Sequence, residues 1–250
     1  MDDDEFERDD GPRYGRIESI APGELMASLR RLQFFDSDMF MRQQAHNLDI
    51  VDQFLLKVEE RVLKELIEGD RTPMEAYFLG AQSQMWMFAA FEVLRTWDQR
   101  VRDFNKLVKT GGLSQKIQAL EAGPDGYQHF GKDIFLAQLT ELRDHPALLD
   151  RALRHQQSIH VAYFRLDFIR IALAKHEVKG RDSSKALYPG YGRINVHCGA
   201  LDYEMENGKY SVGLINRRDI ADSLRYLDLD AEPPSGEDLK DFERYMTGKL

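Results

Sequence analysis

Three side chains near the middle of the chain have the types that proton transfer beside a phosphate requires. Arg154, His155 and His160 lie within one seven-residue stretch. An arginine guanidinium stays charged, and its planar fork matches phosphate oxygens. An imidazole titrates near neutrality, so it takes up and releases protons. The stretch therefore predicts a catalytic site in which Arg154 stabilises charge on a phosphate, His160 acts as acid or base, and His155 binds phosphate or carries a second proton.

The spacing of Arg154 and His160 restricts how they act together. Six residues at about 100° each place them about 120° apart around one helix and about 9 Å apart along it. A single ideal helix therefore does not aim both side chains at one phosphate. The spacing predicts either a bend between them or a homodimer whose twofold axis brings two copies of the segment into one cleft.

The pattern resembles the motif of the ribonucleases in the HEPN superfamily of helical proteins, which carry Arg, four to six residues and then His, often with a polar residue after the arginine. In this chain the motif reads Arg154-His-Gln-Gln-Ser-Ile-His160, and the similarity covers the helical region around it, about residues 39–177. The resemblance implies a compact, commonly dimeric helical bundle that cleaves RNA without a metal, and a role as a toxin or defence effector. RNA supplies its own nucleophile, the 2′-hydroxyl, so the protein needs only a proton acceptor and a cation for the developing phosphorane charge.

A second arginine and histidine, Arg170 and His176, have the same spacing. We set this pair aside because an apolar residue, Ile171, follows the arginine. Two other cations of the same segment, Arg151 and Arg165, are the candidate substrate-binding residues.

The formal net charge of −9 belongs to the ends of the chain. Residues 1–10 hold seven acids and one base, and residues 228–250 hold seven acids and three bases, which leaves residues 11–227 with a net charge of +1. Within that body, residues 148–193 carry nine Lys or Arg against four Asp or Glu. This local excess of positive charge is compatible with a polyanion at one face, so RNA is the predicted partner. A further interpretation is that the acidic ends cover this basic face until they are displaced.

Several classes of protein are disfavoured. The longest apolar run, Met85 to Phe91, is far shorter than the roughly 20 residues that cross a bilayer, so no membrane segment is predicted. The first residues are acidic where a secretory or transit peptide is basic, which predicts a cytoplasmic protein. The single cysteine, Cys198, allows no intrachain disulfide and no multi-thiolate zinc site. The chain has no glycine-rich phosphate loop and no di-iron motif, and no cofactor is predicted.

One metal site is an alternative. His197, Asp202 and Glu204 share a strand face if a bulge interrupts the strand near Gly199. Solvated hairpin residues are the simpler interpretation, and we predict no bound metal.

Helical spacing dominates most of the chain. Apolar residues at steps of three and four, together with helix start and stop signals, predict helices over about residues 22–35, 39–67, 74–107, 113–120, 133–142 and 146–176. The stretch from Ala76 to Leu94 is apolar nearly all round. A helix without a polar face must be enclosed, so we expect this one at the centre of the bundle.

The pattern changes to strands after a linker. Ile194 to Cys198 alternates in polarity as a half-buried strand does, and Asn207-Gly208 is a strong signal for a hairpin. A two-residue turn at that pair sets Met205 opposite Tyr210.

A last short helix follows, with Asn216 as its cap. Arg217 and Arg218 begin it, where cations oppose the helix dipole. A solvated pair is the expected interpretation, with a ligand or an acidic partner as the alternative.

The predicted fold class is therefore mainly α: a helical bundle of about five helices with a C-terminal β-hairpin and short helix. The predicted organisation is a disordered acidic tail, a HEPN-like bundle, a hairpin-and-helix extension and an acidic C-terminal tail, over residues 1–15, 16–180, 181–227 and 228–250. The leading function is a metal-independent endoribonuclease. The alternative is a non-catalytic helical module whose hairpin and acidic tails bind a protein partner or inhibitor.

Overall fold

The computed structural model describes residues 14–69, 71–122, 129–174, 185–186 and 192–249. Its helices are α1 (Glu24–Arg30), α2 (Met39–Glu68), α3 (Glu75–Lys109), α4 (Leu113–Glu121), α5 (Phe130–Asp144), α6 (Ala147–Ala174), α7 (Arg217–Arg225) and α8 (Gly236–Thr247). Its strands are β1 (Lys185–Ala186), β2 (Arg193–Ile194), β3 (Leu201–Glu206) and β4 (Ser211–Ile215). The protein is mainly α with a small antiparallel sheet near the C-terminus, as the sequence predicts.

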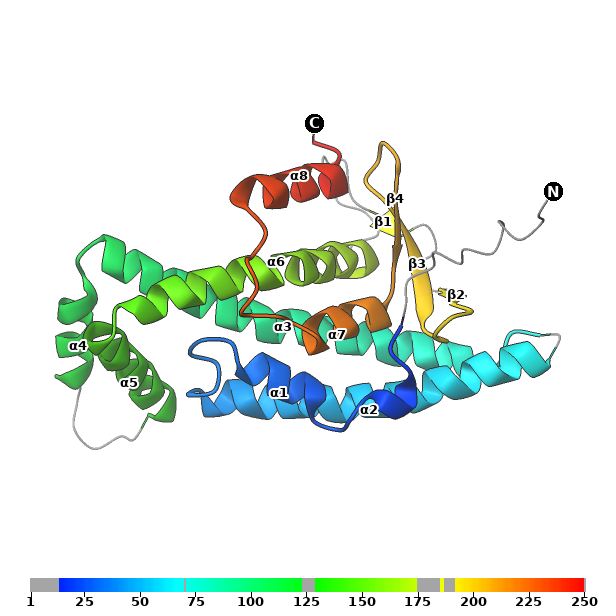
Figure 1. The fold of residues 1–250 in the computed structure, drawn as a ribbon, viewed down its shortest axis with the longest axis horizontal. Helices are drawn as coiled ribbons and strands as arrows, with labels where there is room; N and C mark the ends of the chain where they lie inside the picture. The colour runs from blue at the N-terminus through cyan, green and yellow to red at the C-terminus, as the bar shows by residue number, and fades with distance from the viewer. Residues whose placement is uncertain (1–13, 70, 123–128, 175–184, 187–191, 250) are drawn as a thin grey trace, which may run out of the picture.

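Three long helices form an elongated body (Figure 1). α3 packs against both α2 and α6, and α4 and α5 lie together at one end. α1 packs against α2 and α7, while α8 packs against α6. The sheet is centred on β3, which pairs with β4 and with the two short strands β1 and β2. In the part of the chain that the structure describes, no helix is long and apolar enough to cross a membrane.

The helices begin and end close to the predicted positions. The bounds of α2 to α6 differ from the predicted ranges by at most three residues. At the start of α2, the Asp38 carboxylate accepts hydrogen bonds from the backbone N–H groups of Phe40 (2.9 Å) and Met41 (3.2 Å), which satisfies donors that have no partner within the helix. α1 is shorter than predicted, because the chain turns after Arg30 and reaches a left-handed backbone at Phe34 (φ 68°).

α3 packs centrally, as predicted, but it is not enclosed on every side. Trp86 and Trp97 are buried, and their indole N–H groups donate to the backbone carbonyls of Leu48 (3.1 Å) and Gln33 (2.8 Å). Nevertheless, α3 has exposed residues between positions 75 and 91, and all of them are apolar. The expectation of complete enclosure is therefore wrong for one face of this helix.

The hairpin forms between β3 and β4, but its register differs from the predicted one. Met205 pairs with Gly213, whereas a two-residue turn would set it opposite Tyr210. The side-chain oxygen of Asn207 accepts hydrogen bonds from the backbone N–H groups of Lys209 (3.0 Å) and Tyr210 (3.2 Å). The loop around Asn207 therefore spans four residues, 207–210, where the prediction has a two-residue turn. Together with the bulge next to Met205, it shifts the pairing of β3 with β4.

The segment from Asn195 to Ala200 is a turn, not the predicted strand. The backbone N–H of Asn195 donates to the carbonyl of Ala200 (2.8 Å), so β2 folds back onto β3. Gly199 has a φ of +77°, and a Cβ atom there would lie 2.1 Å from the carbonyl oxygen of Glu59 on α2. This close approach requires glycine. The bulge predicted near Gly199 lies instead at the end of β3, next to Met205.

Residues that the sequence assigns to the two tails pack on the body. The Tyr14 hydroxyl accepts a hydrogen bond from the Asn216 side chain (3.1 Å), and the Gly15 carbonyl accepts one from Arg218. Residues 1–13 lie outside the described residues. The last two residues of the predicted N-terminal tail, Tyr14 and Gly15, therefore belong to the folded body.

The C-terminal region is also more than a tail. A capping box between Ser235 and Asp238 starts α8, and Gly248 ends it in the left-handed conformation. Apolar residues of α8, among them Leu239 and Met246, are buried. Residues 236–247 of the predicted acidic C-terminal tail therefore form a helix with both caps and an apolar face.

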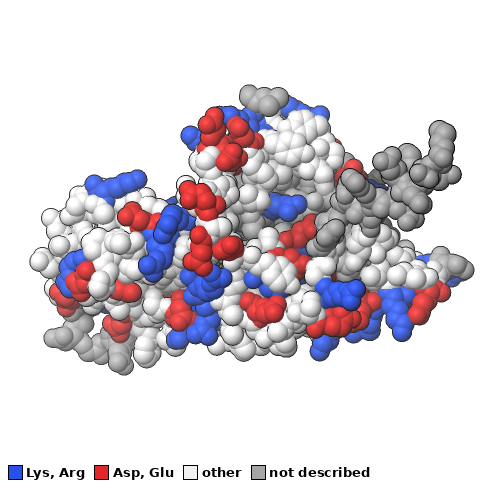
Figure 2. All heavy atoms as spheres, in the orientation of Figure 1, with Lys and Arg blue, Asp and Glu red and all other residues white. Residues whose placement is uncertain are grey.

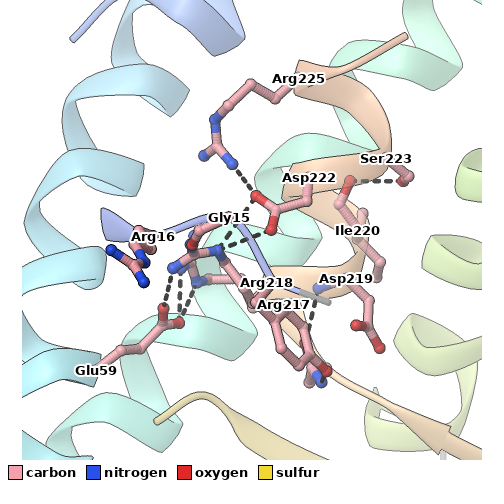
Figure 3. A network of polar contacts seen from close by, with 12 residues as sticks. Gly15, Arg16, Glu59, Arg217, Arg218, Asp219, Ile220, Asp222, Ser223 and Arg225 are labelled. Atoms are coloured by element: carbon pink, nitrogen blue, oxygen red, sulfur yellow. Dashed lines mark hydrogen bonds and ion pairs between the residues drawn. The ribbon is translucent and has the colours of Figure 1, made fainter. Parts of the chain in front are cut away.

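Arg217 and Arg218, at the start of α7, are not the solvated pair that the sequence suggests, because both side chains are buried. Arg217 donates to Glu59 at 2.6 and 2.8 Å and pairs with Asp52, both on α2. Arg218 lies 3.6 Å from Glu59 (Figure 3), and Arg225 pairs with Asp52. The acidic partner considered from the sequence lies within the chain itself.

Asp222 completes this buried ionic network. It accepts hydrogen bonds from Arg218 (3.0 Å) and pairs with Arg225. The guanidinium groups of Arg217, Arg218 and Arg225 are thus balanced by three carboxylates, those of Asp52, Glu59 and Asp222. An unpaired charge in the protein interior would lower the stability of the fold. Burial raises the pKa of the Glu59 carboxyl, against the opposing effect of Arg217.

Substitution of one member tests whether the network joins α7 to α2. In Glu59→Gln a buried guanidinium charge loses its partner, so we expect the free energy of unfolding to fall by about 3–5 kcal/mol. Urea denaturation followed by circular dichroism measures this change. Glu60→Gln is the matched control, because Glu60 is the neighbouring glutamate and is exposed, and its effect should stay within about 0.5 kcal/mol. Equal effects of the two substitutions would contradict the assignment.

Candidate functional site

Arg154 and His160 line the same open groove, which has a volume of about 660 Å³. Its walls come from α3, α6 and α8. The second half of α3 adds Arg102 and Lys109, and α8 adds Leu239. The structure therefore brings the two principal predicted residues to one cavity within a single chain.

Two carboxylates offset part of the positive charge in this groove. Asp98 lies 2.7 Å from Arg102 and accepts a hydrogen bond from the Gln156 side chain (2.8 Å), and Asp150 lies elsewhere in the lining. The three cations of the lining exceed the two carboxylates by one charge, before His160 is counted. The groove is weakly basic.

His160 is partly covered by α8. Its Nε2 atom lies 2.8 Å from Oε1 of Glu243, and no described residue gives this nitrogen a hydrogen bond of good geometry. The contact is an ion pair when the imidazole is protonated. Phe164 lies beside the imidazole (ring centroids 6.1 Å apart) and meets the edge of Phe242 of α8 (5.7 Å). About a quarter of the His160 side chain stays exposed (26%).

His155 does not line the groove. Its side chain is buried, and Nδ1 accepts a hydrogen bond from the backbone N–H of Gln33 (3.0 Å). Burial, together with the charges of Arg151 and Arg154, lowers the pKa of His155 to about 4. A ring held in this way is not available as the phosphate ligand or second proton carrier that the sequence suggests. It fastens the turn after α1 to α6.

The two candidate substrate-binding arginines also lie apart from the groove lining. Arg151 is exposed on the first turns of α6. Arg165 lines a second open cavity of about 730 Å³, bordered by α6, α7 and the β2–β3 region. The structure thus separates these two residues from Arg154 and His160.

The arginine that we set aside has a structural role. Arg170 pairs with Asp167 (2.8 Å) and lies over the ring of Phe91 (4.2 Å from its centroid). His176, the second member of that pair, lies outside the described residues.

The second cavity contains polar residues that the sequence analysis did not single out as a group. Asp202 accepts hydrogen bonds from the side chains of Asn195 (3.0 Å) and Asn216 (2.7 Å). Burial raises the pKa of Asp202 and of Asp219, which also belongs to the lining. No spacing rule connects these residues, because they come from a turn, a strand and the start of a helix.

The alternative metal site does not form. Glu204 pairs with Arg193 (3.0 Å), and Asp202 is held by the two asparagines. Among the described residues, no group of three His, Cys, Asp or Glu side chains is placed to hold a metal ion.

The lowered pKa of His155 predicts a loss of stability in acid. The unfolded chain binds a proton at this residue below about pH 6.5, whereas the folded chain does so only near pH 4. The stabilising contribution is therefore complete above about pH 6.5 and is lost as the pH falls toward 4. In His155→Gln, the dependence of the unfolding free energy on pH in this window should decrease by at most about 1.4 kcal/mol per pH unit. Urea denaturation at several pH values measures it.

His145→Gln is the control for this experiment. His145 is exposed at the end of α5, so its substitution should leave the pH dependence of stability unchanged. A wild-type pH dependence in His155→Gln would show that the buried imidazole is not responsible.

Comparisons of the chain with protein-family models, with curated proteins and with solved structures found no match. The functional argument therefore depends on the geometry of the groove and on the motif itself.

Proposed function

We propose that the groove lined by Arg154 and His160 binds RNA and cleaves it without a metal ion. One observation carries this proposal: a guanidinium and an imidazole of the predicted motif line one open, weakly basic cavity. α6 runs unbroken through both residues, so a single chain lines the groove with them but does not aim both at one phosphate. The homodimer that the spacing suggests is therefore part of the proposal. A role as a toxin or defence effector is part of the same proposal.

The proposed reaction uses the nucleophile of the substrate. His160 takes the proton of the 2′-hydroxyl while the 2′-oxygen forms a bond to phosphorus and the bond to the 5′-oxygen breaks. Arg154 stabilises the negative charge that develops on the phosphate oxygens. Because His155 is buried, the leaving 5′-oxygen takes its proton from water in the open groove.

The cations of α3 have a separate role in this proposal. Arg102 and Lys109 lie in the groove lining and attract the phosphates on either side of the scissile one. Such contacts add affinity but no sequence preference, and their contribution decreases as salt increases.

α8 limits access to the groove. Figure 2 shows acidic side chains over α8 and over the segment that leads to it, beside basic side chains over α6. Glu243 lies against the imidazole of His160, where its negative charge repels a phosphate that enters the groove. The acidic C-terminal region thus supports, for one of the two ends, the interpretation that acidic ends cover the basic face.

No observation favours the alternative of a protein-binding hairpin. The tip of the hairpin is occupied by α8: the side chains of Asn207, Lys209 and Tyr210 all donate hydrogen bonds to the last carbonyls of this helix, those of Tyr245 and Gly248. The residues that a partner would contact first are therefore already engaged within the chain.

The first test is RNA cleavage in the presence of EDTA. We expect the wild-type protein to shorten RNA under these conditions, and His160→Ala and Arg154→Ala each to lower the rate by about 100-fold or more, since each removes a participant in the transition state. Gel electrophoresis of a labelled RNA measures the rate. His145→Ala, at an exposed histidine outside the groove, is the matched control. RNA that stays intact with wild type, or cleavage that survives in both groove variants, rules out the proposal.

A second test addresses α8. Glu243→Gln removes the carboxylate from His160 and should tighten RNA binding about two- to fivefold, the range expected for a partly exposed ion pair. Fluorescence anisotropy with a labelled RNA at low salt measures the affinity. Glu237→Gln makes the same charge change on the same helix at an exposed position. If both variants bind RNA equally, general charge rather than the contact with His160 explains the effect.

A further inference from the structure

The outer surface of the α2–α3 pair exposes apolar side chains along most of its length. On α3, the exposed residues between positions 75 and 91 are all apolar, and exposed apolar residues of α2 adjoin them. We call this surface the α2–α3 face, and its members are Phe40, Ile50, Val51, Phe54, Tyr77, Phe78, Ala81, Met85 and Ala89.

Contacts at both ends show that this face is continuous across the two helices. At one end the rings of Phe54 and Phe78 meet edge to face, with centroids 6.1 Å apart. At the other end Phe40 and Ala89 line one hollow of about 450 Å³. Fourteen residues of α2 separate these contacts, which corresponds to about 21 Å along the helix.

The exposure of these side chains is unusual for a helix of this composition. Tyr77 and Met85 are each 62% exposed, and Phe40 is 53% exposed. A helix that is apolar all round is normally enclosed, and a contiguous exposed apolar surface marks a place of contact. The described neighbours of α3 cover its other sides, and at one edge of the face Tyr77 and Ala81 line a hollow of about 240 Å³ with Leu201 of β3.

None of the nine members of the α2–α3 face is charged, and one exposed cation of α2, Lys57, lies one turn beyond Phe54. Two ion pairs, Arg61–Glu75 (2.5 Å) and Glu92–Arg95 (2.6 Å), flank the face along α3, and each neutralises itself. Between the α2 members of the face lie exposed amide side chains such as Gln44, which both donate and accept hydrogen bonds. A surface that meets a copy of itself must avoid facing like charges, and this surface does so.

We propose that the α2–α3 face binds a second copy of this chain across a twofold axis. Seven of its nine members are large side chains, and at about 100 Å² for each half-exposed one they supply about 700 Å² per chain. This is close to the roughly 800 Å² per partner of a standard stable interface. Two helix pairs that meet in this way form a four-helix layer with an apolar centre and a polar rim.

This interface differs from the one that the motif spacing suggests, and it does not depend on RNA cleavage. The groove uses Arg102 and Lys109 in the second half of α3, whereas the α2–α3 face uses the first half. A dimer formed through this face leaves the groove of each chain open.

The test is the mass of the full chain in solution, measured by light scattering after gel filtration over a dilution series. We expect a dimer of the 29.0 kDa chain that dissociates on dilution.

Met85→Glu should raise the dissociation constant of the dimer at least about 100-fold, because it brings two carboxylates into an apolar contact. Phe54→Ser, which adds no charge, should raise it about tenfold. Val108→Glu is the matched control, since Val108 is an exposed apolar residue of the same helix outside the face.

Circular dichroism shows whether each variant is folded, and Phe54→Ser replaces Met85→Glu in the comparison if the latter is not. A wild-type protein that stays monomeric at the highest attainable concentration overturns the proposal, as does a dimer that neither substitution weakens. Dissociation by Arg154→Glu but not by Met85→Glu places the contact at α6 and also overturns it.

Discussion

The position of α7, and through it the course of the C-terminal region, is constrained by a neutral set of charges buried between α7 and α2. Arg217 and Arg218 enter a region from which water is excluded, and Asp52 and Glu59 meet them there. Breaking such a set is far more costly than forming it is favourable, because any member left alone carries an uncompensated charge in the interior. α7 packs against α1, α3 and α6, and its arginine side chains reach the carboxylates of α2, so its orientation constrains what precedes and follows it in the chain.

β4 ends one residue before the Asn216 cap of α7, so the docked helix also determines where the sheet lies. The sheet in turn directs the hairpin tip toward the C-terminal end of α8, where Asn207 and Lys209 bind the last carbonyls of the helix. α8, which these hydrogen bonds attach to the hairpin at its C-terminal end, lies along α6 and places Glu243 beside His160. A series of contacts through α7, the sheet and α8 thus links the buried network to the groove.

Much of the helical framework could be predicted from the sequence, because each helix repeats its apolar residues with the period of its own backbone. The hairpin could also be located, but not its register, which a side-chain hydrogen bond of Asn207 alters. The buried arginines were assigned to solvent because their partners lie more than 150 residues away in the chain. A signal existed on α2: Asp52 and Glu59 lie seven residues apart within an apolar stripe, two turns of one face.

The candidate site was predictable only in part, for a related reason. One step along a helix turns a side chain by about 100°, so the residue next to Arg154 faces the interior while Arg154 lines the groove. The motif fixes which residues share a helix, but the packing of α3 and α8 against that helix decides which of them meet.

The two halves of α3 also differ in the side chains that they expose. Its first half exposes only apolar side chains, and its second half exposes the charged residues that line the groove, such as Arg102 and Lys109. The proposed dimer contact and the proposed RNA-binding groove use successive halves of one helix, so neither proposal excludes the other.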